Sequence, residues 1–294
     1  MCNRLLVLAG CQRIADQTQR SLALYWPVNE ALGCQFDELF TNQFEMVTEE
    51  ALAHILKTNF NVKVYNAWRT NGPTYRTIRR DGDPDADIVI IKGWSHPRFE
   101  DETHSPEIDA DVRRRLLKLQ PRPEIQARAD AITFDGPVFG VHIRRGDCLE
   151  VFGKSREEHF FRLMEGVRQR CPAARFFLAT DVAEVEARFH HTFPGLIVSA
   201  PKRWAPRHER EGVWEGLIDL LLLARTVGII GTTQSSFSQT AERIGGIPLI
   251  VADELNAGPL LPEASRMLAL AASRSNRVPG SLTARASAPQ PVHV

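Results

Sequence analysis

A short apolar run at residues 138–141 ends in side chains that could bind an anion: His142, Arg144, Arg145 and, after one glycine, Asp147. In the simpler interpretation, a buried strand meets solvent here and the polar residues form a turn. In the functional interpretation, the strand directs a guanidinium, a permanent and forked cation suited to phosphate oxygens, toward a ligand. His142 lies inside the apolar segment, a position more typical of a hydrogen-bonded core histidine than of a catalytic base.

Two later segments also place polar side chains directly after an apolar run. Asp181 follows one of them, and Thr233, Ser235 and Ser236 follow another, just before a predicted helix. Backbone N–H groups and hydroxyls at a helix N-terminus can bind an anion, although such hydroxyls are more often simple caps. Asp181 is expected to accept hydrogen bonds from ligand hydroxyls or base N–H groups. Gathered at one sheet edge with Arg144, these groups predict a pocket for a phosphorylated, nucleotide-type ligand.

The elements that must position these residues alternate regularly from residue 138 onward. Short apolar runs rich in β-branched residues predict strands, and the longer segments between them predict helices. This alternation indicates a parallel, doubly wound sheet, in which ligands bind at the carboxyl ends of the strands. Ser155 and Glu158 predict a capping box for the first helix of this half. The predicted strands are residues 138–143, 174–180, 195–200, 227–231 and 247–253, and two of the helices are residues 213–225 and 235–245.

The first half is also α/β but less regular. Helices at residues 109–120 and 123–132 are expected to form the bridge between the halves, which places a domain boundary after residue 132. The polar, Pro/Ser/Ala-rich segment 273–294 is expected to be a disordered tail. The other predicted elements are strands at residues 21–27, 61–67 and 87–94 and helices at residues 3–19 and 49–56.

The first predicted helix begins almost at Met1. A doubly wound domain normally opens with a strand and a glycine-bearing turn before its first helix. Two interpretations stay open: the domain starts with a helix, or a first strand and part of the loop are missing from this chain. We expect that the native product starts upstream and restores the strand.

Composition restricts the class of protein. The chain has 294 residues, 43% of them hydrophobic, with 36 basic and 36 acidic side chains. This balance provides no global field toward nucleic acid or a membrane surface, so any anion site must be local. The five cysteines show neither zinc-ligand nor redox spacing, which favours a reducing compartment. Neither an apolar run of about 18 residues nor a signal peptide is recognisable, and we expect a cytoplasmic protein without a membrane span.

The segments HIRRGD (142–147) and TTQSSFSQTAERIGG (232–246) resemble the fucosyltransferase superfamily, whose members carry an HxRRxD-type motif. LATD (178–181) is similar to the family's strand ending in Asp, and GLIDLLLLART (216–226) is similar to its Asp-bearing helix, with Asp219 in that position. Near the start, Asn3 and Arg4 match the end of the family's GxGNR/Q turn. The resemblance covers about residues 2–255 and is strong in the second half.

The resemblance implies a GT-B fold: two Rossmann-like domains with parallel sheets facing across a cleft. It places the acceptor side in residues 1–132 and the nucleotide sugar in residues 133–272. By this carry-over, Arg144 holds the β-phosphate of GDP-fucose and stabilises the leaving diphosphate, and Asp147 orients that arginine or its neighbours. The expected substrate-binding residues are His142, Asn3, Arg4, Asp181, Asp219, Thr233, Ser235, Ser236 and Phe237.

The reaction implied is an inverting transfer that needs no metal or other cofactor. Arg144 supplies the positive charge at the diphosphate that Mg²⁺ supplies in other glycosyltransferases. The acidic segment DGDPDAD (81–87) lies in a predicted loop, not at a strand end, which argues against a metal-binding DxD pair. Glu150, the acid that closely follows Asp147, is a candidate catalytic base. The resemblance also leaves open a base near the first glycine turn, in the part of the loop that this sequence lacks.

The expected partners are a nucleotide sugar and a glycan-type acceptor. Two other functions stay open: a degenerate relative that binds GDP-sugars without turnover, and an unrelated phosphate-binding α/β enzyme.

Overall fold

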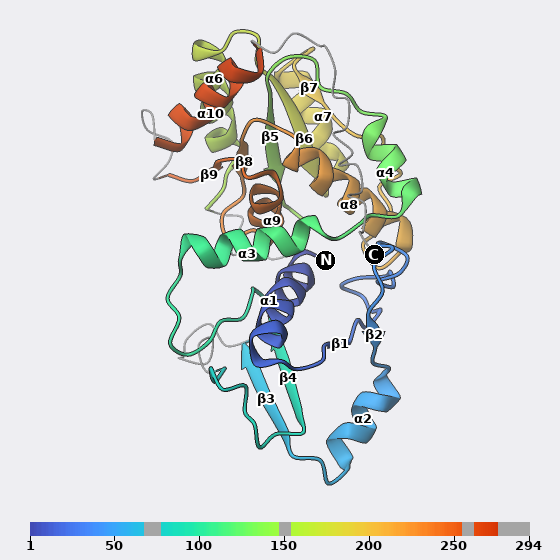
Figure 1. Ribbon diagram of the computed structural model, residues 1–294. Helices are drawn as coiled ribbons and strands as arrows, with labels where there is room; N and C mark the ends of the chain where they lie inside the picture. The colour runs from blue at the N-terminus through green and yellow to red at the C-terminus, as the bar shows by residue number, and fades with distance from the viewer. Residues whose placement is uncertain (68–77, 147–153, 255–261, 276–294) are drawn as a thin grey trace, which may run out of the picture.

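The computed structural model describes residues 1–67, 78–146, 154–254 and 262–275 (Figure 1). Its main feature is a five-stranded parallel sheet in the second half, with the strand order β7-β6-β5-β8-β9. In this order the chain crosses over to either side of its first strand, β5, the arrangement of a doubly wound domain. The strands are β5 (Val138–Ile143), β6 (Arg175–Thr180), β7 (Ile197–Val198), β8 (Ile229–Gly231) and β9 (Leu249–Val251).

Helices cover both faces of this sheet, and the alternation along β5 shows why. Phe139, Val141 and Ile143 pack on one face against α6, α7 and α10, whereas Val138 packs on the other face against α8 and α9. All residues of β5 are buried, as expected for the central strand of a parallel sheet. The helices are α6 (Glu157–Arg170), α7 (Ala183–Thr192), α8 (Arg210–Ala224), α9 (Ser236–Gly245) and α10 (Pro262–Ser275).

The first half holds two small parallel pairs of strands, β1 with β2 and β3 with β4. α1 packs against β4 and extends to α3 and α9, so that it connects the small β3–β4 sheet with the second half (Figure 1). The elements are α1 (Cys2–Thr18), β1 (Ala23–Leu24), β2 (Glu45–Met46), α2 (Glu49–Lys57), β3 (Val62–Ala67), β4 (Ile88–Gly93), α3 (Pro106–Leu117) and α4 (Pro123–Asp130).

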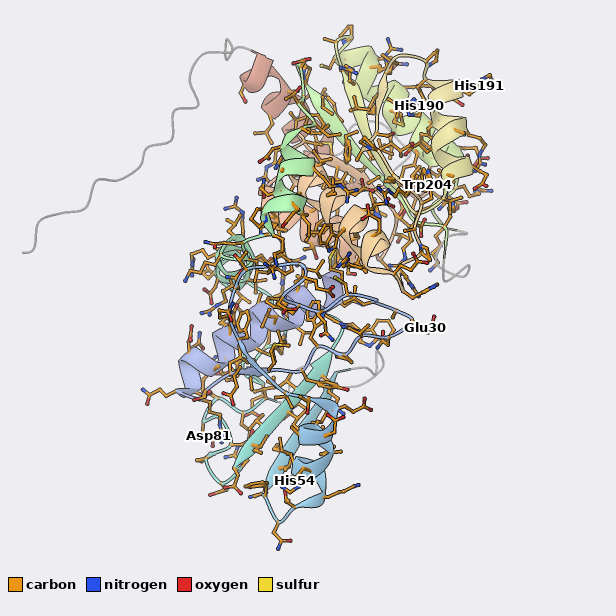
Figure 2. All side chains as sticks on the ribbon, turned by 90° about the vertical axis from the view of Figure 1, so that its right-hand side faces the viewer. Glu30, His54, Asp81, His190, His191 and Trp204 are labelled. Carbon is orange, nitrogen blue, oxygen red and sulfur yellow. The ribbon has the colours of Figure 1, made fainter. Side chains whose placement is uncertain are left out.

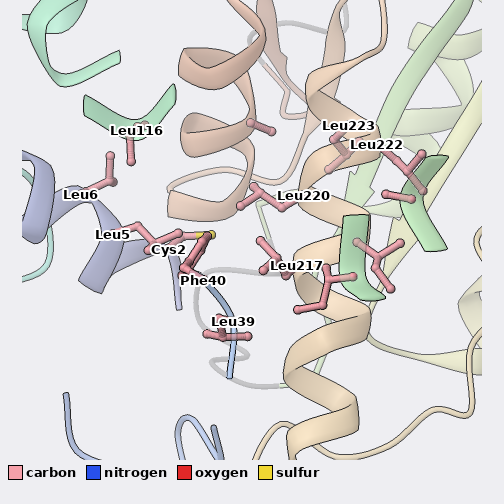
Figure 3. Close-up of a cluster of buried hydrophobic side chains, with 14 of the residues drawn as sticks. Cys2, Leu5, Leu6, Leu39, Phe40, Leu116, Leu217, Leu220, Leu222 and Leu223 are labelled. Carbon is pink, nitrogen blue, oxygen red and sulfur yellow. The ribbon is translucent and has the colours of Figure 1, made fainter. Parts of the chain in front are cut away.

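One apolar cluster joins the two halves. Leu5 and Leu6 of α1 belong to the same group of buried side chains as Leu116 of α3 and Leu217 and Leu220 of α8 (Figure 3). α3 packs on α1 and α9, and α4 packs on α8, so the expected bridging helices do contact both sides. Because burial of this surface is favourable, it stabilises the position of α1 against the larger sheet.

Most predicted elements are present, and the differences have local causes. The expected strands at 21–27 and 195–200 shrink to two residues each, since each pairs with one neighbouring strand over only two residues. The predicted capping box is wrong: α6 begins after Arg156, and the hydroxyl of Ser155 instead accepts a hydrogen bond from the backbone N–H of Thr233 at 3.0 Å. α10, which was not predicted, carries the chain to Ser275, so the first residues of the expected tail are helical.

None of the helices that the structure describes combines the length and the apolar character needed to cross a bilayer.

Candidate active site

A cavity of about 1660 Å³ lies at the carboxyl edge of the five-stranded sheet and is lined by both halves of the chain. It is larger than the roughly 300–1,000 Å³ typical of a small-molecule pocket, so it has room for a ligand and part of a second one. The lining includes Asn3, Arg4, Trp26 and Trp94 from the first half, and His142, Arg144, Asp181, Lys202, Trp204, Asp219, Ser236 and Phe237 from the second.

The two adjacent arginines after β5 have different surroundings. Arg144 lines the cavity, and its backbone N–H donates to the hydroxyl of Thr232 at 3.1 Å. The guanidinium of Arg145 donates to two carbonyls, those of Arg144 at 3.0 Å and Ser155 at 2.7 Å. Arg145 therefore stabilises the loop, and Arg144 is the arginine placed at the cavity.

Asp181 binds the backbone of the turn after β5. Its two carboxylate oxygens accept from the N–H groups of Arg145 at 2.8 Å and Gly146 at 2.9 Å. A Cβ on Gly146 would come within 2.8 Å of one of these oxygens, which explains the need for glycine. Asp181 therefore fixes the backbone that carries Arg144, and its expected contact with a ligand stays a prediction.

The N-terminal end of α9 contributes the hydroxyl-rich segment. Ser236 and Phe237 line the cavity, and Ser235 is the N-cap residue of the helix without a side-chain cap hydrogen bond. The Ser235 hydroxyl is buried and has no hydrogen-bond partner among the residues that the structure describes. The backbone N–H of Thr233 donates to the hydroxyl of Ser155, and Thr233 does not line the cavity. Unpaired N–H groups at this helix end give a favourable position for an anion beside Arg144.

His142 is a buried, neutral side chain at the floor of the cavity. Its Nδ1 lies 2.7 Å from the hydroxyl of Ser238, and its ring stacks on Phe237 at a centroid distance of 4.7 Å. Burial, reinforced by the charges of Arg144 and Lys202, lowers the pKa of His142 to about 3. A group with so low a pKa is a weak proton acceptor at neutral pH, which favours binding over base catalysis.

Asp219 of α8 forms a buried ion pair that the sequence did not reveal. Lys202 Nζ lies 2.8 Å from one carboxylate oxygen of Asp219 and donates to the carbonyl of Thr180 at 3.0 Å. The other carboxylate oxygen of Asp219 is buried without a hydrogen-bond partner in residues 1–67, 78–146, 154–254 and 262–275. Burial raises the pKa of Asp219 to about 6, although Lys202 acts in the opposite direction. Near neutral pH the carboxylate is therefore ionised, with one oxygen available to a ligand donor at the cavity.

Lys202 precedes a strained residue. Trp204, labelled in Figure 2, has a φ of 60°, a backbone conformation that is rare for bulky side chains. Its ring lies 5.0 Å from Lys202 Nζ and lines the cavity. Lys202 and Trp204 could have been found only from their position after the third strand of the sheet, since no motif contains them.

Of the two matched residues at the start of α1, Asn3 lines the cavity directly. Arg4 also lines it, but its guanidinium donates to the carbonyl of Pro27 at 2.6 Å and lies over the ring of Trp26 at 5.1 Å. Arg4 therefore links α1 to the segment that follows β1.

Two expected catalytic residues, Asp147 and Glu150, lie outside the described residues and stay predictions. In the acidic segment 81–87, Asp83 accepts from the hydroxyl of Tyr65 and Asp87 accepts from the N–H of Asn61 at 2.8 Å. These two carboxylates brace the loop.

Comparison with known proteins agrees with this geometry. The chain is 26% identical to nodulation protein Z of Bradyrhizobium diazoefficiens, over 85% of this chain and 77% of that protein. Its fold is similar to the crystal structure of the NodZ alpha-1,6-fucosyltransferase soaked with GDP-fucose, with a TM-score of 0.58 and 22% identity over 87% of this chain and 93% of that one. A mutant of Arabidopsis thaliana FUT1 in complex with GDP also has a TM-score of 0.58, with 11% identity over 85% and 67% of the two chains. No family model matches the chain.

Proposed function

The chain is homologous to the fucosyltransferases represented by nodulation protein Z, and from this premise we propose that it transfers fucose from GDP-fucose to a hydroxyl group of a glycan. The observation that carries the proposal is the placement of Arg144 beside the N-terminal end of α9, in a cavity that both halves line. A diphosphate bound there would contact a forked cation and unpaired backbone N–H groups together.

We infer that the two halves of the chain bind different substrates, as in a GT-B glycosyltransferase. Residues 133–272 would bind the nucleotide sugar, and residues 1–132 would contribute the acceptor side of the cavity. The carboxylate oxygen of Asp219 that no described residue bonds would accept from N–H groups of the guanine base. Ser236 and Phe237, with the neutral ring of His142, would line the donor position.

In the proposed reaction, the acceptor hydroxyl attacks the anomeric carbon from the face opposite the diphosphate, which inverts its configuration. Arg144 neutralises the negative charge that develops on the departing β-phosphate, so this step needs no divalent cation. The acceptor proton passes to a base, for which Glu150 is the candidate.

Calorimetric titration with GDP tests this proposal. We expect GDP to bind in the presence of EDTA as well as without it, because the arginine provides the charge that a metal supplies elsewhere. UDP should bind much more weakly, since uracil lacks the N–H pattern of guanine. Absence of GDP binding at millimolar concentration in a folded sample would contradict the donor site.

A transfer assay with GDP-fucose and EDTA then separates an enzyme from a degenerate binding protein. Fucose transfer, or slow hydrolysis of GDP-fucose, is expected to continue after chelation. Loss of turnover on chelation, restored by Mn²⁺, would contradict the metal-independent mechanism, and GDP binding without any turnover would favour the binding protein.

A further inference from the structure

Three potential metal ligands meet outside the cavity, where the segment after β4 approaches the start of α3. His96, His104 and Asp109 each offer one ligand atom, and these atoms lie within 4.8 Å of one another. The cluster lies apart from the cavity, whose lining includes none of the three. It is also separate from the acidic segment 81–87, where a metal was considered from the sequence.

His96 is the buried member of the cluster. Within the described part of the chain, its Nε2 atom is buried without a hydrogen-bond partner, and its Nδ1 atom lies 3.4 Å from the hydroxyl of Ser95. In the tautomer in which Nδ1 donates to that hydroxyl, Nε2 carries the lone pair, the arrangement usual for metal-binding histidines. An unpaired imidazole nitrogen in a buried position is costly unless something binds it.

The other two ligands are already in contact. His104 Nε2 lies 3.1 Å from a carboxylate oxygen of Asp109, and the His104 side chain is 63% exposed, so it can turn toward an ion. Asp109 is fixed by its place in the first turn of α3, which Ser105 caps by accepting from the N–H of Ile108.

We propose that His96, His104 and Asp109 bind a Zn²⁺ ion, with water completing the coordination. Two imidazoles and one carboxylate suit zinc, whereas Mg²⁺ and Ca²⁺ prefer oxygen ligands. Zinc–ligand bonds of about 2.0–2.2 Å require the atoms to draw closer than they are now, which the exposed His104 can accommodate. The ion would link the segment after β4 to α3, away from the proposed transfer chemistry.

Two arginines place positive charge beside the cluster. Arg243 of α9 lies 3.5 Å from the second oxygen of Asp109, and Arg98 also acts on His96 with a positive charge. Burial, together with these arginines, lowers the pKa of His96 to about 4, so the imidazole is neutral and able to bind a metal near pH 7.

The test is calorimetry with ZnCl₂ on the untagged full chain after removal of metal ions, with MgCl₂ for comparison. We expect one Zn²⁺ per chain and no response to Mg²⁺. His104→Ala and Asp109→Asn should each weaken zinc binding by about tenfold or more. Both change side chains at the edge of the cluster, so they should fold even if a variant of the buried His96 does not. Circular dichroism checks that each is folded.

His191→Ala is the matched control, because it removes an exposed histidine on α7 (Figure 2). It should leave zinc binding unchanged. With Co²⁺ in place of Zn²⁺, the wild type should show the visible absorption of a low-symmetry site with nitrogen ligands, and the two cluster variants should lose it. Wild-type zinc affinity in either cluster variant, or equal loss in His191→Ala, would overturn the proposal, as would absence of zinc binding to the wild type.

Discussion

Replacing Arg144 by lysine is expected to lower kcat/KM for GDP-fucose by about two to three orders of magnitude, the loss typical of removing one aligned donor from a developing anion. The substitution keeps the positive charge but removes the planar fork that can contact two phosphate oxygens at once. Arg144 lines the cavity, whereas the guanidinium of its neighbour Arg145 is bonded to carbonyls of the loop. The loss should therefore be specific to position 144 and should appear in turnover and in GDP affinity.

The stability of the protein provides the control for this variant. Arg144→Lys should melt close to the wild type, because it keeps the positive charge and the hydrogen bond from the backbone N–H of residue 144 to Thr232. Arg170→Lys, at an exposed arginine on α6, should change neither activity nor melting temperature. Turnover by Arg144→Lys close to the wild-type value would show that this side chain does not contact the diphosphate.

The second half of the fold could be predicted because its signals are local and repeated. The apolar run of β5 and the hydroxyls before α9 identify a strand end and a helix start, and parallel strands must bring such ends to one edge. The roles of Arg144 and Arg145 could not be separated in this way. They are adjacent in sequence, and only the three-dimensional positions of Ser155 and Asp181 decide which one the loop uses.

Other features escaped prediction because they depend on long-range contacts. Ser155 has the spacing of a capping residue, yet its hydroxyl bonds Thr233, which is far along the chain. Lys202 is a single lysine after a weak strand, and nothing in its neighbourhood indicates that it is 5% exposed beside Asp219. The cluster of His96, His104 and Asp109 also escaped prediction. These residues have no zinc-motif spacing, and the path of the segment before α3 brings them together.

The second large effect is expected for Lys202→Met, which should lower the free energy of unfolding by about 3–5 kcal/mol because it leaves the buried Asp219 carboxylate without its cation. Glu186 and Glu215 add negative charge near Asp219. Among the groups that shift the pKa of Asp219, Lys202 is the cation, so its removal leaves the carboxylate beside two other acids. The double variant Lys202→Met/Asp219→Asn removes both charges and should recover part of the loss. Denaturant unfolding of the two variants and the wild type measures the difference.

The pH dependence of the stability loss in Lys202→Met identifies the Asp219 carboxylate as its cause. In the wild type the pKa of Asp219 is raised from 3.8 to about 6, so its contribution to stability is full below pH 3.8 and is lost as the pH rises through 6. Without Lys202 the pKa must rise further, and the protonated, uncharged acid persists to higher pH. The destabilisation by Lys202→Met should therefore be larger at pH 8 than at pH 5.5, and the double variant should show little of this difference. An equal loss at both pH values would indicate that packing of the lysine stem, and not the ion pair with Asp219, is what stabilises this wall of the cavity.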